Sequence, residues 1–372
     1  MQASIIRKLV GTALLLVTVC LSAYFGIRSM LHPLDPRLVK ADNEFGFRLF
    51  RQLLRENPDR NIVISPVGVA LAMQLVYNGA SGETKRQMAK TLGIEDISVR
   101  DLNRMNGKLM AVLSDPNLGL GVDVENSLSA GKGIRFKPDF LAVSSRYYKA
   151  ELLNSTSGRK GGLSLTSQSR FRGQWMYILN KSIFERVAIR HGGREINAKA
   201  IGTFGVFNLR ANKTEGVDII QLPYSDAGVS MYLFDCFPKQ ILGSQSWTVW
   251  ERWISQMQKT VVMVCIPIFR IQSTTDLGSS LSPLGIDLSS RTARDDLGNM
   301  CSQPCNIRGM EHSAFVQAQE GGSRPAPKRT SPFPEVYIVQ DPTFFVIRDD
   351  RTGLILFMGW VADPTEGLKP SD

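Results

Sequence analysis

The residues of this sequence with the clearest chemistry are Lys328, Arg329 and Thr330, two adjacent bases followed by a hydroxyl. They lie in residues 320–334, a segment with four prolines and almost no apolar side chains. Proline fixes φ and removes a backbone donor, so we expect this segment to be extended, solvated and open to a protease. An acidic specificity pocket recognises a basic side chain before the bond that is cut. The segment therefore predicts a trypsin-like or furin-like serine protease as a partner, with Arg329 as the preferred bait residue and Lys328 as the second choice.

Residues suited to catalysis are sparse in the rest of the chain. The only histidines are His32, His191 and His312. No Ser, His and acid arrangement, nucleophile elbow or phosphate-binding loop is visible around them. We therefore expect a protein that is not an enzyme and that uses no cofactor.

The cysteines are also few. Cys20 lies in an apolar N-terminal segment, and the others are Cys236, Cys265, Cys301 and Cys305. Four are too sparse for a disulfide scaffold in a chain of this size. Cys301 and Cys305 either close a small loop or stay reduced, and without a neighbouring histidine or carboxylate cluster they do not predict a metal site.

The N-terminus carries a targeting signal. Residues 9–27 contain no charge and follow Arg7 and Lys8, a length between that of a signal-peptide core and a membrane span. We expect residues 1–27 to be a signal peptide, with an uncleaved anchor as the alternative, and the protein to be secreted. Three triplets match the acceptor pattern for N-glycosylation, at Asn154, Asn180 and Asn212.

The composition of the chain limits the class of protein it can be. With 372 residues, 43% hydrophobic and 21% charged, it is an ordinary globular sequence. A formal net charge of +10 favours encounter with polyanions without specifying a fold.

The spacing of apolar residues predicts the helices and strands that must position the 320–334 segment. Residues 41–54 predict a helix with Phe45 and Leu49 on its buried face and with Asp42 and Asn43 as caps. Residues 61–66 predict a short buried strand, and residues 67–77 a helix that is apolar nearly all round. A strand over 314–318 precedes the segment. Two apolar runs within 342–364, separated by a turn at 349–353, predict a hairpin after it.

Several of these stretches together resemble the serpin family. They include residues 61–66, 79–84, 171–175, 217–224 with its Gln-Leu-Pro-Tyr ending, 312–315 (His-Ser-Ala-Phe), 320–323 (Glu-Gly-Gly-Ser) and 356–359 (Leu-Phe-Met-Gly). The resemblance follows the family's order from about residue 41 to residue 364.

The resemblance implies an α+β fold, with one serpin domain over residues 40–366, three β-sheets surrounded by helices, and a C-terminal tail at 367–372. Residues 320–334 would be the exposed reactive loop, and Glu320, Gly321, Gly322 and Ser323 its hinge. In inhibitory members a serine protease attacks the loop and forms an acyl-enzyme. The cut loop then inserts into the main sheet as a new strand and traps the protease.

The loop itself disfavours that insertion. Pro325 and Pro327 would each remove a backbone donor on the same side of the inserted strand. Arg324 and Lys328 would share one face and Arg329 the other, so either register turns a charge toward the covered side. The loop is several residues shorter than in typical inhibitory members. A cut after Arg329 would free only about 24 Å of strand from Ser323 onward.

The main sheet also departs from the family pattern. Only 13 residues separate Glu151 and Leu165, where roughly thirty more would supply a helix across the sheet face. Residues 166–170 are polar where the family has a mostly apolar strand. These residues are either a strand exposed to solvent by the loss of that helix or a poorly folded segment.

A second site is indicated by Arg100, Arg104 and Lys108, which recur every four residues and would form one stripe on a helix. The segment corresponds loosely to the helix through which some serpins bind heparin-like polyanions; the alternative is a solvated helical face. No aromatic platform accompanies the charge, so nucleic acid is not expected as a partner.

Two functions remain open: a secreted inhibitor of a serine protease, or a non-inhibitory serpin that is a protease substrate, carrier or binding protein.

Overall fold

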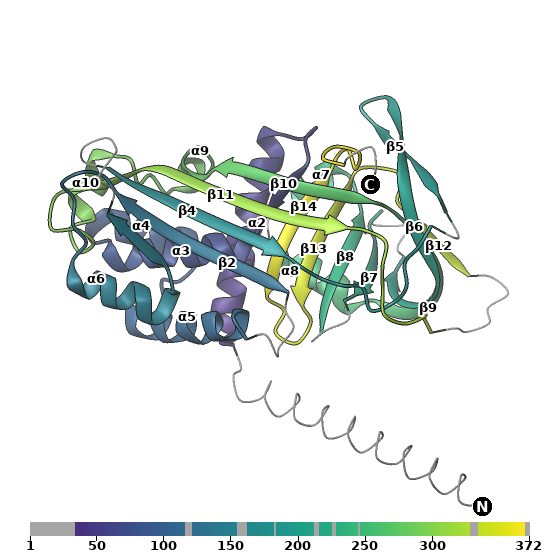
Figure 1. The fold of residues 1–372 in the computed structure, drawn as a ribbon, viewed down its shortest axis with the longest axis horizontal. Helices are drawn as coiled ribbons and strands as arrows, with labels where there is room; N and C mark the ends of the chain where they lie inside the picture. The colour runs from purple at the N-terminus through teal and green to yellow at the C-terminus, as the bar shows by residue number, and fades with distance from the viewer. Residues whose placement is uncertain are drawn as a thin grey trace, which may run out of the picture.

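The computed structural model describes residues 34–115, 121–154, 162–181, 184–211, 216–224, 228–244, 246–327 and 334–368. Helices and strands alternate irregularly along the chain, and the α+β fold class is confirmed (Figure 1). The described strands form one five-stranded and one nine-stranded sheet. Two of the three expected sheets are continuous because the 17-residue strand β6 (Arg194–Arg210) pairs with β9 over residues 200–209 and also with β7 over residues 208–210.

The five-stranded sheet contains β11, the strand that precedes the 320–334 segment. Its strand order is β10 (Phe269–Asp276), β11 (Asn306–Ala318), β4 (Gly162–Phe171), β2 (Val122–Ala130) and β3 (Glu151–Asn154). The central pair, β11 and β4, runs parallel, whereas β10 pairs with β11 and β2 pairs with β4 antiparallel. The predicted strand before the loop is therefore the end of β11.

The nine-stranded sheet supplies most of the remaining core. Its path is β1 (Ile62–Ile64), β14 (Ile355–Val361), β13 (Thr343–Asp349), β8 (Val229–Asp235), β7 (Asp218–Pro223), β6, β9 (Gln258–Pro267) and β12 (Glu335–Ile338), with β5 (Arg186–His191) paired to β6. The predicted hairpin after the loop is confirmed as β13 and β14, which are buried along nearly their whole length. The loop therefore leads from the five-stranded sheet into β12, an edge strand of the nine-stranded one.

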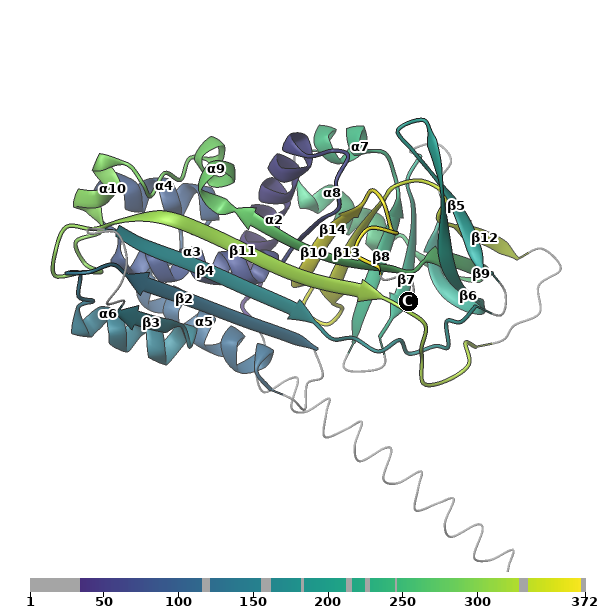
Figure 2. The same cartoon turned by 45° about the horizontal axis from the view of Figure 1, so that its top comes forward.

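The helices gather mainly on one side of the five-stranded sheet (Figures 1 and 2). They are α2 (Pro36–Glu56), α3 (Pro66–Gly79), α4 (Gly82–Leu92), α5 (Val99–Leu113), α6 (Pro138–Val143) with the π-helical turn Ser144–Tyr148, α7 (Pro238–Gly243), α8 (Trp247–Ser255), α9 (Leu277–Leu281) with the 3₁₀ turn Ser282–Leu284, and α10 (Arg291–Asp296). The predicted core helix is α3, in which every residue from Val67 to Tyr77 is buried.

The first helix begins earlier than its periodicity predicts. Its N-cap is Asp35, whose Oδ1 accepts a hydrogen bond from Arg37 N at 3.0 Å, and Pro36 occupies the first turn. This cap and proline start the helix five residues before Ala41. The prediction that Asp42 and Asn43 cap the helix is therefore wrong, because both lie buried inside it.

Asp42 forms an unusual buried pair with Gln74 of α3. Asp42 is 1% exposed, and its Oδ1 accepts a hydrogen bond from Gln74 Nε2 at 2.7 Å. The other two oxygens of the pair, Asp42 Oδ2 and Gln74 Oε1, are buried without a partner among the described residues. A proton on Oδ2 turns this oxygen into a donor that can pair with an acceptor such as Gln74 Oε1, whereas an ionised carboxylate offers acceptors only. Burial raises the pKa of Asp42 to about 8, so we infer that Asp42 is a neutral acid at pH 7.

The outward face of the five-stranded sheet bears no helix in the described part of the chain (Figure 1). Only residues 155–161, which are outside that part, connect β3 to β4. Strand β4 is formed over the whole polar stretch and alternates between buried and exposed side chains, with Ser164, Gln168 and Arg170 exposed. Of the two readings of residues 166–170, the solvent-exposed strand is therefore the one observed. The polar residues stay in contact with water on a face that nothing described covers.

Candidate functional site: the loop after β11 and the seam between β11 and β4

The residues predicted as bait lie outside the described part of the structure. Lys328, Arg329 and Thr330 belong to residues 328–333, so their geometry remains a prediction. The hinge residues from Glu320 to Ser323 are described, as is the chain up to Pro327. The site is therefore built from the segment that precedes the bait.

Residues 319–327, called the strap below, are docked against the body of the protein. Arg324 N donates to Met176 O at 3.2 Å, and Ile178 N donates to Arg324 O at 2.8 Å. Gly321 and Leu179 exchange both of their backbone hydrogen bonds, at 2.8 and 3.0 Å. The prediction of an open loop is therefore wrong for the strap, which lies against residues 176–179 (Figure 2). The predicted exposure to water is retained by most of the strap, in which only Ala326 is buried.

The far end of the strap also docks against strand β6. Val206 N donates to Pro327 O at 2.9 Å, and Ala326 is only 6% exposed. A Cβ on Gly205 would lie 2.5 Å from the Ala326 Cβ, so the close approach requires glycine at 205. Pro327 takes part through its carbonyl oxygen alone. The prolines that would weaken an inserted strand are thus compatible with the docked position.

An aromatic cluster anchors the start of the strap. The Trp175 indole Nε1 donates to Gln319 O at 2.9 Å. Its ring stacks on Tyr224 with centroids 4.5 Å apart and planes 9° apart, and Phe171 contacts the same tyrosine edge-on at 4.7 Å. These residues lie in the segments 171–175 and 217–224 that resemble the serpin family, but the sequence did not predict that the indole binds the strap. The rings bury this corner and fix the direction in which the strap leaves β11.

The glycine at 322 lies in tight contact with the opposite backbone. Gly322 has φ +131°, and a Cβ there would be 2.3 Å from Tyr177 O and 2.6 Å from Ile178 Cα. Only glycine fits both this conformation and this spacing. The hinge residue is therefore required for docking of the strap.

The seam between β11 and β4 is closed. Their Cα partners run from Asn306 and Gly162 to Phe315 and Arg170, with a single register shift near Gly309. A loop entering the sheet here would have to break this parallel ladder along its length. The structure therefore describes the sheet without an inserted strand.

Beneath the seam, His312 joins β11 to neighbouring elements. His312 is fully buried; its Nε2 accepts from Ser65 N at 2.9 Å, and its Nδ1 lies 3.1 Å from Ser167 Oγ. Because Nε2 accepts, the ring proton belongs on Nδ1 and is donated to Ser167. Desolvation lowers the pKa of His312 to about 4, so the ring is neutral at pH 7. The histidine therefore has a structural role, joining β11 to β4 and to the residue that precedes α3.

The predicted basic stripe lies on α5 and is exposed. Arg100, Arg104 and Lys108 all face solvent, as the spacing predicts. Arg104 pairs with Asp101 at 2.8 Å, and both side chains are well exposed. Water screens such a pair, so it reduces the positive charge of the stripe without burying it.

The three asparagines predicted as glycosylation sites differ in their exposure to solvent. Asn154 is exposed at the end of β3, Asn180 is half-buried, and Asn212 lies outside the described residues. Glycosylation of the three stays a prediction.

All four described cysteines are free and buried. Among the described residues, no group of His, Cys, Asp and Glu side chains is arranged to hold a metal ion. In that part of the chain no helix is long and apolar enough to cross a bilayer, and residues 9–27 lie outside it.

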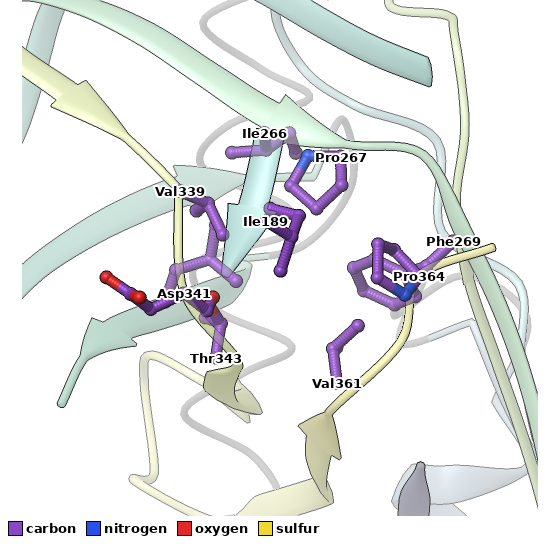
Figure 3. A pocket seen from close by; sticks show the side chains of 10 residues that line it. Ile189, Ile266, Pro267, Phe269, Val339, Asp341, Thr343, Val361 and Pro364 are labelled. Carbon is purple, nitrogen blue, oxygen red and sulfur yellow. The ribbon is translucent and has the colours of Figure 1, made fainter. Parts of the chain in front are cut away.

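An apolar pocket is lined by side chains from several strands of the nine-stranded sheet and from β10 of the five-stranded sheet (Figure 3). Ile189, Ile266, Phe269, Val339 and Val361 point into it from four strands and a loop. Its volume is about 10 Å³, which is room for one water molecule at most, whereas small-molecule sites usually need about 300–1,000 Å³. This pocket does not hold a carrier's ligand in the conformation described.

In this fold one loop connects β11 of the five-stranded sheet to β12, an edge strand of the nine-stranded sheet. A model of the family "Serpin (serine protease inhibitor)" matches residues 40–160 and 152–364. The chain belongs to the serpin family.

Individual relatives are distant. Iripin-2 of Ixodes ricinus is 24% identical over 88% of this chain and 94% of its own length. Thyroxine-binding globulin of Rattus norvegicus is 25% identical, with 87% and 88% covered. The crystal structure of native protease nexin-1 with heparin superposes with a TM-score of 0.80 at 20% identity, covering 89% of this chain and 100% of that one. The relatives thus carry the same fold in a family of inhibitors that also contains a named binding globulin.

Proposed function

We propose that this serpin presents its loop to a serine protease of trypsin-like or furin-like specificity, is cut near Arg329, and does not trap the protease. The protein is then a protease substrate or binding protein with a serpin fold. Inhibition, which the family at large performs, is the alternative. The observation that carries the proposal is the docked strap over residues 319–327.

Insertion would first have to release the strap. Seven hydrogen bonds hold it, five between backbone groups and two from the side chains of Trp175 and Ser323. At a net 0.5–1.5 kcal/mol each, their loss costs roughly 4–10 kcal/mol. The gain from insertion is reduced, because Pro325 and Pro327 have no N–H to offer the seam strands. This balance favours a loop that stays outside the sheet.

The seam strands add a second cost. An inserted segment would separate β11 from β4, whose ladder includes the hydrogen-bonded pair His312 and Ser167. Arg324 would enter the sheet with its charge, while in the docked strap it is exposed to water. Burying an unpaired guanidinium costs several kcal/mol.

Cleavage with trypsin and with a furin-type protease tests this proposal. We expect a clean cut near Arg329, no protease–serpin band that survives denaturant, and no rise in the melting temperature of the cut protein. The Arg329→Ala variant should lose or shift the cut, which locates it in the loop. A denaturant-resistant band at the summed mass would establish acyl trapping and overturn the proposal.

The N-terminal segment bears on where the protein acts. We propose that residues 1–27 direct the chain into the secretory pathway and that the protein acts outside the cell, where trypsin-like proteases meet exposed loops. The uncharged run at 9–27 supports this.

The stripe on α5 is proposed to bind heparin-like polyanions, as its exposure and the heparin in the protease nexin-1 structure suggest. We expect the triple variant Arg100→Ala, Arg104→Ala and Lys108→Ala to leave a heparin column at lower salt than the natural chain. The melting temperature should stay the same, because all three side chains are exposed. Elution at unchanged salt would identify the stripe as an ordinary solvated face.

A further inference from the structure

We propose that the outward face of the five-stranded sheet holds a binding site for an acidic oligosaccharide, a short chain of sugar rings bearing sulfate or carboxylate groups. The site is a hollow of about 580 Å³ at the end of the sheet nearest the strap. Side chains from three strands and the turn after β4 line it, chiefly Arg170, Arg172, Arg270, Gln272, Phe315 and Gln317.

Strand register places these side chains in two neighbouring rows. Phe315 of β11 is the Cα partner of Arg170 on β4 and of Gln272 on β10. Two residues further along β11, Gln317 is the partner of Arg270. Residues two apart share a face of a sheet, so both rows point outward. The hollow thus has an aromatic ring in its floor, with arginines and carboxamides around it.

The arginines are available for an anionic ligand. Among the described residues no carboxylate pairs with Arg170 or Arg270, while Arg172 pairs with the exposed Asp123 at 2.8 Å. The Arg270 guanidinium lies over the Phe315 ring, 5.3 Å from its centroid. This stacking fixes the guanidinium and leaves its N–H donors at the rim free to form paired bonds with a sulfate or carboxylate.

The face favours a sugar chain over an extended acidic peptide. Strand β11 is hydrogen-bonded on both sides, to β10 and to β4, so a peptide finds no free backbone edge here. What the face offers instead are the carboxamides of Gln272 and Gln317, which can donate to and accept from hydroxyl groups. Hydroxyl groups beside fixed anionic groups are the chemistry of an acidic oligosaccharide.

The site is open because no described helix crosses this face. Neither the strap nor α5 contributes a residue to its lining. Its test therefore uses a chain that already carries Arg100→Ala, Arg104→Ala and Lys108→Ala, so that α5 does not contribute. A sulfated heparin tetrasaccharide is the probe, and its dissociation constant is measured by titration calorimetry. Arg170→Ala with Arg270→Ala is the test pair. Arg194→Ala with Arg308→Ala, two exposed arginines elsewhere, is the control pair.

We expect the test pair to weaken binding at least tenfold and the control pair to change it less than twofold, with melting temperatures preserved in both. Phe315→Leu should weaken binding severalfold through loss of the stacked Arg270. Equal losses in both pairs would mean that net charge alone is responsible, and no loss in the test pair would overturn the site. Equal affinity for a short polyglutamate would overturn the choice of sugar.

Discussion

The Asp42→Asn variant is expected to be more stable than the natural chain at pH 7, by roughly 4 kcal/mol, and equally stable near pH 4. The natural Asp42 is buried against Gln74 and has its pKa raised from 3.8 to about 8 by desolvation. Asparagine has the same shape. It can donate from Nδ2 to Gln74 Oε1 and accept from Gln74 Nε2 through Oδ1, without titrating.

The sign of the pH effect on folding stability follows from the protons bound by the folded and unfolded chains. Between pH 3.8 and about pH 8 the unfolded chain releases the Asp42 proton while the folded chain keeps it. The stability contributed by this group is therefore complete at low pH and declines as pH rises, by about 1.4 kcal/mol per pH unit. Asp42→Asn removes that decline.

Denaturant unfolding at pH 4.5, 6 and 7.5 measures the difference, with Asp96→Asn as the control. Asp96 is an exposed aspartate, so the same Asp-to-Asn replacement there does not touch a buried pair. We expect the stability gap between Asp42→Asn and the natural chain to widen with pH, and the gap for the control to stay near zero. A gap for Asp42→Asn that is flat across pH would show that Asp42 is ionised in the fold.

The Gly322→Ala variant is expected to release the strap without unfolding the protein. Its Cβ would collide with the backbone of Tyr177 and Ile178, neither of which is the end of a flexible side chain. The strap hydrogen bonds that begin at Gly321 would then be lost, while the seam and the core remain. We expect trypsin to cut the loop at least tenfold faster, because a protease needs its substrate free to adopt an extended shape.

Gly321→Ala is the matched control for this change. Both glycines have a positive φ, so both alanine variants carry backbone strain, but a Cβ at Gly321 meets nothing within 4 Å and the collision is absent there. Cutting rates and melting temperatures of the two variants distinguish release from general damage. If both glycine variants are cut at the natural rate, the strap does not limit access to the loop.

Local signals were sufficient to predict many elements. Two apolar runs on either side of a turn predicted β13 and β14, and the apolar run at 67–77 predicted the buried α3. The start of α2 was missed because the apolar period begins at residue 41, whereas Asp35 and Pro36 fix the N-terminus by capping. Asp42 looked like a cap for the same reason, although its position on the buried face follows from the earlier start.

Local sequence patterns could not predict that the strap is docked. Its partners, residues 175–179 and 205–206, lie more than 100 residues away in the sequence. Composition argued for exposure, since two prolines, an arginine and a serine surround Ala326. That single alanine between prolines was the available signal, and it becomes meaningful only when Gly205 is seen to make room for it. The same holds for the hollow around Arg170 and Arg270, which depends on cross-strand register.

The most direct measurement of whether the loop enters the sheet is backbone hydrogen exchange on the protein before and after a single cut near Arg329. The informative amides are Ile178, Leu179 and Val206, which donate to Arg324, Gly321 and Pro327 of the strap. If the loop stays docked, these three amides remain protected to the same degree after the cut. Loss of their protection, together with a higher melting temperature, would mean that the strap has left its site and entered the seam between β11 and β4, contradicting the proposed function.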